Sequence, residues 1–379
     1  MAKVAYVKKK IGQSYLVWLQ NSNLYFQLEE PAWFAFRKLA KRYRAETIAV
    51  EFGQRYGVSV EESLAFVAEM RDRVEEFNQA PVSVENDCSD MDIFRKYVFT
   101  PISVHQYQFG TKVVRFSYEK EGLVKYIHPL VEHLEVAADQ RESSSFELFT
   151  CEGRVVFRLN GEVKGYWGKA DSEYTKGKIF LELINVLHDK SDSDWLMTVH
   201  ASAITNGQKT ILFSAEPGSG KTTMAAMLQA EGFQLISDDF VPFDKYSMQA
   251  YPFPIAMSVK EGAMKLMASL YPDLENRPLH YVGPEKQVRY LPVENHKMKM
   301  IFPAHELVFI KYDQEVDFRM VKLEPIQAIK MLLDQIWVPP SPENVELLFD
   351  RLEQFSFYQL VYSNNRKALD AIKQLFDHD

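Results

Sequence analysis

One short segment constrains the fold of this chain more than any other. Ala215–Thr222 reads Ala-Glu-Pro-Gly-Ser-Gly-Lys-Thr, a phosphate-binding loop of the Walker A kind in which Ala215 stands where the first glycine is usual. The loop follows an apolar run, Thr210–Ser214, and precedes a helical pattern, Met224–Ala230, that Gly232 closes. A strand that leads through glycines into a helix N-terminus presents backbone N–H groups to an anion. The segment therefore predicts a nucleotide site in an α/β protein.

The residue types of this loop each have a physical role. Gly218 and Gly220 let the backbone bend so that N–H groups face phosphate oxygens. Lys221 can reach the β- and γ-phosphates, and the Thr222 hydroxyl can bind Mg²⁺. The alternative is a glycine-rich strand–helix connection with a buried or surface lysine. The residues expected to contact the nucleotide are Glu216, Pro217, Gly218, Ser219, Gly220, Lys221, Thr222 and Thr223.

Two carboxylates follow a second predicted strand. Phe233–Ser237 is a short apolar run, and Asp238 and Asp239 come directly after it. Ligands of open α/β sheets bind at the carboxyl ends of strands. One carboxylate can hold Mg²⁺, while the other can accept a proton from an attacking hydroxyl. Such a pair is often only a solvated strand end, but its position 17 and 18 residues after Lys221 favours a chemical role.

A hairpin signal places a histidine near the loop. Asn206-Gly207 separates two apolar runs, and this dipeptide is the strongest two-residue hairpin signal. If Thr205 pairs with Gln208, then His200 lies opposite Phe213, level with the entry to the loop. A slip of one residue would turn His200 to the other face, and a lone strand histidine can equally be structural.

Together these three elements resemble the catalytic core of HPr kinase/phosphorylase in their order and spacing. The resemblance is specific over about 195–245, is similar there to HPr-kinase-related proteins among peptide-modifying enzymes, and is diffuse over about 90–379. It implies a phosphoenolpyruvate-carboxykinase-like P-loop kinase core that uses ATP and Mg²⁺. Ala215 departs from the family's loop, as does Thr222-Thr223, where the bifunctional enzymes have Ser-Glu. HPr as substrate and a phosphorylase back-reaction are therefore not implied.

The resemblance also implies roles for the residues. Lys221 and the loop amides hold the phosphates, and Thr222 and Asp239 hold Mg²⁺. Asp238 is the base toward a Ser or Thr hydroxyl of a peptide or small protein, and His200 orients the acceptor. The sequence by itself does not separate the roles of the two aspartates.

Farther along the chain, two cations are candidates for the charge of the transferring phosphoryl group. These are Lys260 and Arg289, and either can equally be a surface charge. Pro272–Pro292 resembles a mobile loop that could cover the active site. The strand pattern at Phe357–Tyr362 and the helix pattern at Asn365–Phe376 are expected to be packing elements.

The first 80 residues form a separate predicted domain. Ser14–Leu19 and Leu24–Leu28 are expected strands, Pro31 opens the first of three helices, and Ser59–Glu62 is a capping box before the third. This pattern resembles the PqqD-like, winged-helix-type α+β domains that bind a leader peptide as an added strand. A structural cap is the plain alternative. DNA binding is a further alternative, although the basic residues concerned also suit a solvated helix face: Lys38, Lys41, Arg42 and Arg44.

The remaining chain is expected to be a catalytic domain, residues 93–379. Asn78–Asp92 is polar, acidic and without periodicity, so it is the predicted linker. Short alternating segments between Tyr97 and Gly165 predict a β-rich extension, with a hairpin turn at Asn160-Gly161, and Lys176–His188 predicts a helix.

Composition limits the class of protein. The chain has 379 residues and a formal net charge of −8, which argues against non-specific nucleic-acid binding. Its two cysteines, Cys88 and Cys151, suit a reducing compartment. A signal-peptide core and a long apolar run are absent from the sequence, so we expect a cytoplasmic protein without a membrane partner.

The expected function is an ATP-dependent peptide or protein kinase in a peptide-modification pathway. A homo-oligomer is among the expected assemblies. One alternative is a nucleotide-dependent regulatory or peptide- or DNA-binding protein with little kinase activity. Another is a small-molecule kinase, which would leave the N-terminal domain unexplained.

Overall fold

The computed structural model describes residues 4–79, 91–168, 172–282, 286–293 and 301–377. The protein is mixed α/β, with several sheets. Its chain divides into two compact units, one formed by residues 1–85 and 322–358 and the other by residues 86–321 and 359–379. Most of the predicted linker, residues 80–90, lies outside the described residues.

The first unit contains an antiparallel sheet of order β1-β2-β3 and the three expected helices. The elements are β1 (Tyr6–Ile11), β2 (Ser14–Leu19), β3 (Leu24–Glu29), α1 (Glu30–Ala40), α2 (Ala45–Tyr56) and α3 (Val60–Phe77). The capping box is confirmed, because the Ser59 hydroxyl accepts from the Glu62 N–H and the Glu62 carboxylate accepts from the Ser59 N–H. Strand β1 was not predicted from the sequence, because its three consecutive lysines, Lys8 to Lys10, hide the alternation of polar and apolar residues that marks a strand.

Residues 322–358, placed in the catalytic domain by the sequence, pack with this first unit. They form α10 (Pro325–Leu333), β21 (Ile336–Trp337) and α11 (Pro342–Leu352). Helix α11 lies against β1, where Lys9 forms ion pairs of 2.8 Å with Asp350 and Glu353. The ring of Tyr25 meets Phe349 edge-on, with centroids 6.2 Å apart. Such a return of the chain leaves no signal in local periodicity.

The second unit begins with the β-rich extension, a sheet of order β6-β4-β5-β7-β8-β9. Its strands and small helices are α4 (Met91–Lys96), β4 (Ser103–Phe109), β5 (Lys112–Tyr118), α5 (Glu121–Val124), α6 (His128–Val131), β6 (Glu135–Val136), β7 (Ser144–Cys151), β8 (Arg154–Leu159) and β9 (Glu162–Gly168). The predicted two-residue turn is confirmed: Leu159 pairs with Glu162, and Asn160 and Gly161 both have positive φ, as a primed hairpin turn requires.

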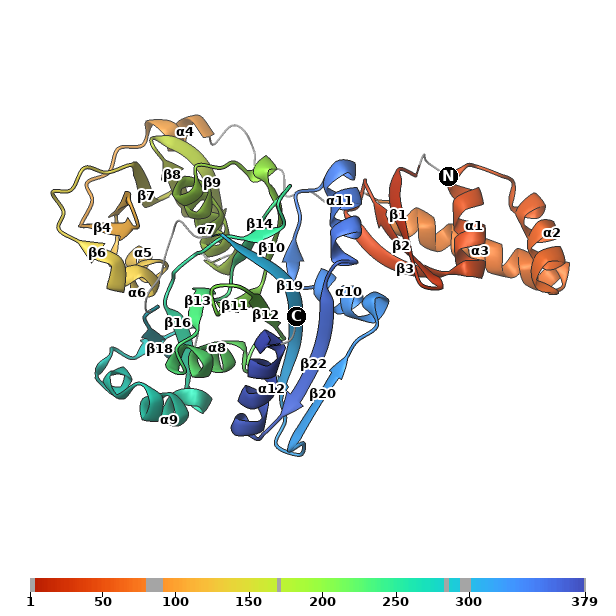
Figure 1. The fold of residues 1–379 in the computed structure, drawn as a ribbon. Helices are drawn as coiled ribbons and strands as arrows, with labels where there is room; N and C mark the ends of the chain where they lie inside the picture. Colours follow the sequence, from red (N-terminus) through yellow and green to blue (C-terminus); the bar gives the residue numbers. More distant parts are fainter. Residues whose placement is uncertain (1–3, 80–90, 169–171, 283–285, 294–300, 378–379) are drawn as a thin grey trace. The chain divides into compact units, whose positions relative to one another are not determined.

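A mixed sheet carries the loop. Its strands follow the order β13-β11-β12-β19-β15-β14-β10, with β22 beside β19 and β20 beside β22 (Figure 1). Strand β12 runs parallel to β19 and antiparallel to β11. The elements are β10 (Trp195–Val199), β11 (Ala201–Thr205), β12 (Thr210–Ser214), α8 (Lys221–Ala230), β13 (Gln234–Ser237), β14 (Val241–Asp244), β15 (Gln249–Ala250), β19 (Phe302–Tyr312), β20 (Phe318–Lys322), β22 (Ser356–Tyr362) and α12 (Asn365–Asp377).

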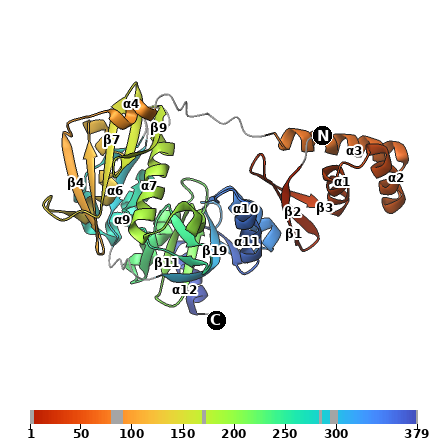
Figure 2. The ribbon, with the colours of Figure 1, turned by 90° about the horizontal axis from the view of Figure 1, so that it is seen from above.

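Helix α7 (Ser172–His188) joins the cores of these two sheets. It lies along the β-rich extension in both views of the ribbon (Figure 1 and Figure 2). Phe180 contacts Phe253 edge-on, and both belong to one buried cluster with Phe146 and Phe157 of the extension. Burying a side chain of this size contributes about 1.5–3 kcal/mol, so the helix fixes the extension to the sheet that carries the loop.

The predicted register of the hairpin before the loop is wrong by two residues. Thr205 pairs with Thr210, and Ala201 pairs with Ser214. The Asn206 side chain causes the difference, because its Oδ1 accepts from the N–H groups of Gln208 and Lys209 at 3.0 and 2.8 Å. An Asx turn of this kind replaces the tight Asn-Gly turn. A shift of two residues keeps every side chain on its face and moves His200 to the level of the loop itself.

The segment expected to be a mobile loop, Pro272–Pro292, contains regular structure instead. It includes β17 (His280–Tyr281) and β18 (Gln287–Leu291), which form a sheet with β16 (Met257–Lys260) in the order β16-β18-β17. Helix α9 (Glu261–Leu270) precedes it. Paired residues of β16 and β18, such as Val259 and Arg289, are 30 positions apart, so this pairing leaves no local signal in the sequence.

No helix among the described residues combines the length and the apolar composition that crossing a membrane requires.

The capping box allows a test of the first unit in solution. We expect Ser59→Ala to cost about 1 kcal/mol, because a backbone N–H at the start of α3 loses its acceptor. Hydrogen exchange of the α3 amides in the full chain should then accelerate about fivefold. Glu61→Gln is the control, since it removes a first-turn charge and keeps the capping box. Equal exchange in Ser59→Ala and the parent chain would contradict the assigned cap.

Candidate nucleotide and phosphoryl-transfer site

The predicted loop connects β12 to α8 in the way the sequence indicated. Gly218 has φ 92° and Gly220 has φ 104°, both in the left-handed region, where a side chain is disfavoured. Gly220 is the N-cap residue of α8. The turn is closed by the Ser219 N–H, which donates to the Glu216 carbonyl at 3.2 Å. The first turn of α8 therefore directs its backbone N–H groups, and the positive end of the helix dipole, at the space above the loop.

The loop rests on two tyrosines. The Tyr312 N–H donates to the Ser219 carbonyl at 3.1 Å. A Cβ added at Gly220 would lie 3.4 Å from the Tyr362 hydroxyl and 3.8 Å from Tyr312 Cβ. The two rings meet edge-on, with centroids 5.7 Å apart. Glycine is thus favoured at position 220 by its φ, whereas an added Cβ would make only ordinary van der Waals contacts with residues of β19 and β22.

Lys221 and His200 form a partly buried contact beside the loop, in which Lys221 is buried and the His200 side chain is 41% exposed. Lys221 Nζ lies 2.7 Å from His200 Nε2 and 3.5 Å from the Ala215 carbonyl. Burial lowers the pKa of Lys221, against the pull of Asp239 and Asp238. Burial also lowers the pKa of His200, and the charge of Lys221 lowers it further. His200 is therefore neutral, with Nε2 accepting from Lys221 and Nδ1 donating to the Asp239 carbonyl at 3.1 Å.

Asp238 is a fully buried carboxylate. The Thr222 hydroxyl donates to its Oδ2 at 3.0 Å, and the Ser202 hydroxyl donates to its Oδ1. Burial is the largest cause that raises the pKa of Asp238 to about 7, and the neighbouring Asp239 charge acts in the same direction. The two hydroxyl groups oppose this shift because they stabilise the charged form. Asp238 is thus attached to the loop helix through Thr222 and to β11 through Ser202.

Asp239 differs from Asp238 in backbone conformation, in solvent exposure and in its contacts. Its φ is 74°, a conformation that is uncommon for a residue with a side chain and that occurs at functional sites. Its side chain is 32% exposed, and Oδ1 lies 4.0 Å from His200 Nδ1. A carboxylate that reaches solvent beside a neutral imidazole is available to a substrate.

The structure brings five of the sequence-predicted residues together, namely His200, Lys221, Thr222, Asp238 and Asp239. A sixth sequence candidate, Lys260, lies near enough for its charge to lower the pKa of both His200 and Lys221. In the loop, Glu216, Pro217 and Gly218 are exposed, and Thr223 lies in the first turn of α8.

For Arg289 and Thr222 the structure shows contacts other than those expected. The guanidinium of Arg289 donates to the carbonyls of Glu275, at 2.8 Å, and Arg277, so the contacts of Arg289 hold the chain after α9. The sequence left open which aspartate accompanies Thr222, and the resemblance favoured Asp239. In the structure the Thr222 hydroxyl contacts Asp238.

Ser202 and Tyr362 belong to the site and were not found from the sequence. Ser202 lies in the middle of an apolar strand, and only the pairing of β11 with β13 brings it to Asp238. Tyr362 comes from the C-terminal part of the chain, 142 residues after Gly220. A serine inside an otherwise apolar strand is the one available signal for Ser202.

In comparisons with known proteins, no family model matches the chain, and no curated protein matches it in sequence.

The buried carboxylate predicts a pH-dependent stability. Because its folded pKa is raised above the ordinary value near 4, Asp238 contributes stability at low pH that is lost as pH rises through about 7. Asp238→Asn removes the cost of the buried charge. We expect the variant to be more stable than the parent by on the order of 1 kcal/mol at pH 8, with a smaller difference at pH 5. Urea unfolding at both pH values measures this, and an equal difference at both would contradict the raised pKa.

Proposed function

We propose that this protein is a kinase that transfers the γ-phosphoryl group of ATP to a Ser or Thr hydroxyl of a peptide or small protein. The single observation that carries the proposal is the convergence of Lys221, the Thr222–Asp238 pair and the His200–Asp239 pair at one glycine loop. The order of these elements supports a core of the phosphoenolpyruvate-carboxykinase-like type, related to HPr kinase. The mixed sheet with a loop between β12 and α8 is consistent with such a core.

The phosphate end of the nucleotide has three sources of positive charge in this proposal. The amides at the N-terminus of α8 and in the loop bind the phosphate oxygens. Lys221 neutralises their charge, and its contact with neutral His200 keeps the ammonium at the loop without a competing salt bridge. Lys260 supplies a second cation in place of Arg289.

Mg²⁺ suits the oxygen donors on the Thr222 side. A hydroxyl that binds Mg²⁺ with a lone pair still donates its hydrogen, and the Thr222 hydroxyl already donates to Asp238. Thr222 would therefore hold the ion directly, and Asp238 would accept from Thr222 and from water around the ion. When bound, Mg²⁺ neutralises charge on the β- and γ-phosphates.

Asp239 is the better candidate for the base, which reverses the assignment favoured from the resemblance. Both oxygens of Asp238 are engaged by hydroxyl groups in a buried position, so an acceptor substrate would have to displace them. Asp239 reaches solvent, and His200 holds its backbone carbonyl. A Ser or Thr hydroxyl beside Asp239 would transfer its proton to that carboxylate as the oxygen attacks phosphorus.

The first unit is proposed to recruit the peptide. Strand β3 is an edge of its sheet, most of its side chains are partly or fully exposed, and Leu24 is 45% exposed. An extended leader peptide can add to such an edge as a further strand. DNA reading by the basic helix residues has less support, because Lys38 forms an ion pair of 2.5 Å with Glu51.

A pair of isosteric substitutions tests the two carboxylates. We expect Asp239→Asn to lower single-turnover transfer by a factor on the order of 10² or more, while nucleotide affinity stays within about tenfold. Asp238→Asn should instead weaken the Mg²⁺ dependence of nucleotide binding, because Thr222 loses its anionic acceptor. Lys221→Ala is the reference that loses both properties. Calorimetry with Mg²⁺-nucleotide and transfer from γ-labelled ATP to Ser- and Thr-containing peptides separate these effects.

Three outcomes decide among the function classes. Normal phosphoryl transfer by Asp239→Asn would contradict the assignment of Asp239 as the base. Tight nucleotide binding with no transfer to any peptide would favour a regulatory protein. Transfer only to small alcohols would favour a small-molecule kinase.

The recruiting role of the first unit is testable in the full chain. Deleting residues 1–80 is unsuitable, because residues 322–358 pack with them. We expect Leu24→Glu to raise KM for the peptide about tenfold with little change in kcat, because one apolar contact on the β3 edge is lost. Val50→Glu, at a similarly exposed position on α2, is the matched control. Equal KM values for both variants would mean that the peptide does not bind along β3.

A further inference from the structure

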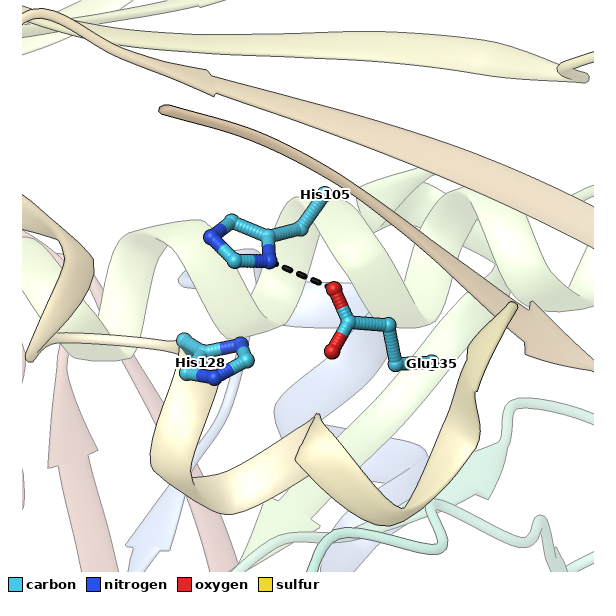
Figure 3. A group of neighbouring side chains, drawn as sticks. All are labelled: His105, His128 and Glu135. Atoms are coloured by element: carbon cyan, nitrogen blue, oxygen red, sulfur yellow. Dashed lines mark hydrogen bonds and ion pairs between the residues drawn. The ribbon is translucent and has the colours of Figure 1, made fainter. Parts of the chain in front are cut away.

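Two histidines and a glutamate converge at the edge of the β-rich extension. His105 lies on β4, His128 begins α6, and Glu135 begins β6, which pairs with β4 (Figure 3). Each side chain offers one ligand atom, and these three atoms all lie within 4.8 Å of one another. Tyr107 pairs with Glu135 across the two strands, so His105, two residues earlier, shares a face with this carboxylate.

The hydrogen bonds around the imidazoles assign the ring nitrogens. His105 Nδ1 lies 2.6 Å from Glu135 Oε1, and its Nε2 lies 2.6 Å from the Ser103 hydroxyl. His128 Nδ1 lies 2.8 Å from the hydroxyl of buried Tyr107. Each ring therefore has a neighbouring hydroxyl on one nitrogen, which leaves Nδ1 of His105 and Nε2 of His128 for a ligand. Histidines that bind metals are held in this way by a partner on the other nitrogen.

We propose that His105, His128 and Glu135 form a binding site for a zinc ion, separate from the Mg²⁺ of the phosphoryl-transfer site. Two imidazoles and one carboxylate are a ligand set that Zn²⁺ takes, with a fourth position left for water. Ligand atoms around tetrahedral zinc are separated by about 3.3 Å, so small side-chain rotations bring the three atoms to that spacing. Mg²⁺ prefers oxygen ligands and is a poor fit for two imidazoles.

Access from solvent suits this ligand set. The Glu135 side chain is 39% exposed and that of His105 is 19% exposed, so an ion can enter from solvent. His128 is also partly buried, and its Nδ1 is engaged by the Tyr107 hydroxyl. Without an ion, the contact between His105 and Glu135 is an ordinary ion pair or hydrogen bond, which is the alternative that the experiment has to separate.

An ion here would tie together three segments. It would link β4, β6 and the short helix α6, which has too few turns to be stable by itself. The Leu130 carbonyl of α6 accepts from the Ala256 N–H at 2.7 Å, directly before β16. The site therefore has a structural consequence that is measurable apart from any catalysis.

Zinc titration of the full chain in excess Mg²⁺ tests the proposal. We expect one zinc per chain after dialysis, measured by elemental analysis, and a rise in the thermal midpoint with added zinc. Glu135→Gln and His128→Gln should each weaken zinc binding at least about tenfold, as judged by competition with a chromogenic chelator. Co²⁺ in place of zinc should give the visible absorption of a tetrahedral site in the parent chain and not in the variants.

Two controls make the result decisive. Glu132→Gln, which removes a neighbouring carboxylate outside the group, should lower zinc affinity far less than Glu135→Gln, because the charge of Glu132 acts on His128 only through space. Lys221→Ala in the loop should leave zinc affinity unchanged. Circular dichroism checks that the Glu135 and His128 variants are folded. Zinc affinity that is equal in the parent and in folded Glu135→Gln and His128→Gln chains, or less than one zinc per chain at saturating metal, would overturn the proposal.

Discussion

The buried carboxylate of Asp238 is the constraint on which the geometry of the site depends. It lies at the end of β13, and hydrogen bonds join it to Ser202 of β11 and to Thr222 of α8. A charged group in such a position costs free energy unless it is fully hydrogen-bonded or bound to a cation. Its raised pKa expresses that cost. The loop, the strand before it and the carboxylate pair therefore take up one arrangement together, and a bound cation would relieve the remaining electrostatic cost.

The contacts of His200 with Lys221 and Asp239 determine where charge lies in the site. His200 stays neutral because partial burial and the neighbouring charge of Lys221 both lower its pKa. A neutral imidazole can accept from an ammonium on one side while donating to a carbonyl on the other. Lys221 is thereby held at the loop, and Asp239 is held in a left-handed conformation that turns its carboxylate outward. Adjacent aspartates thus have opposite environments, which is how one pair can divide metal support from proton transfer.

In the first unit, residues that lie far apart in the sequence pack against each other. The ion pairs of Lys9 with Asp350 and Glu353 join residues from opposite ends of the sequence. They place a returning segment against β1, while β3 remains an edge strand of the same sheet. This β3 edge is the one proposed to take up a peptide, and helix α10 of the returning segment also contacts β3.

Local sequence was sufficient wherever neighbouring residues determine the conformation. The glycines of the loop, the Ser59 capping box, the Asn160-Gly161 turn and the strand before Asp238 were all predicted, because each depends on φ preferences or on hydrogen bonds within a few residues. The hairpin at Asn206 was placed correctly and its register was not, since an Asx turn and a tight turn share the same residue types.

Tertiary structure decided what depends on strand pairing and on the return of the chain. Which aspartate meets Thr222, the arrival of Ser202 and Tyr362 at the loop, and the grouping of His105, His128 and Glu135 all follow from contacts between distant residues. Arg289 looked like a phosphate cation because only its charge was visible in the sequence, whereas its fold neighbours are backbone carbonyls. A sequence carries the type of each side chain, and the packing of sheets and helices alone determines which side chains meet.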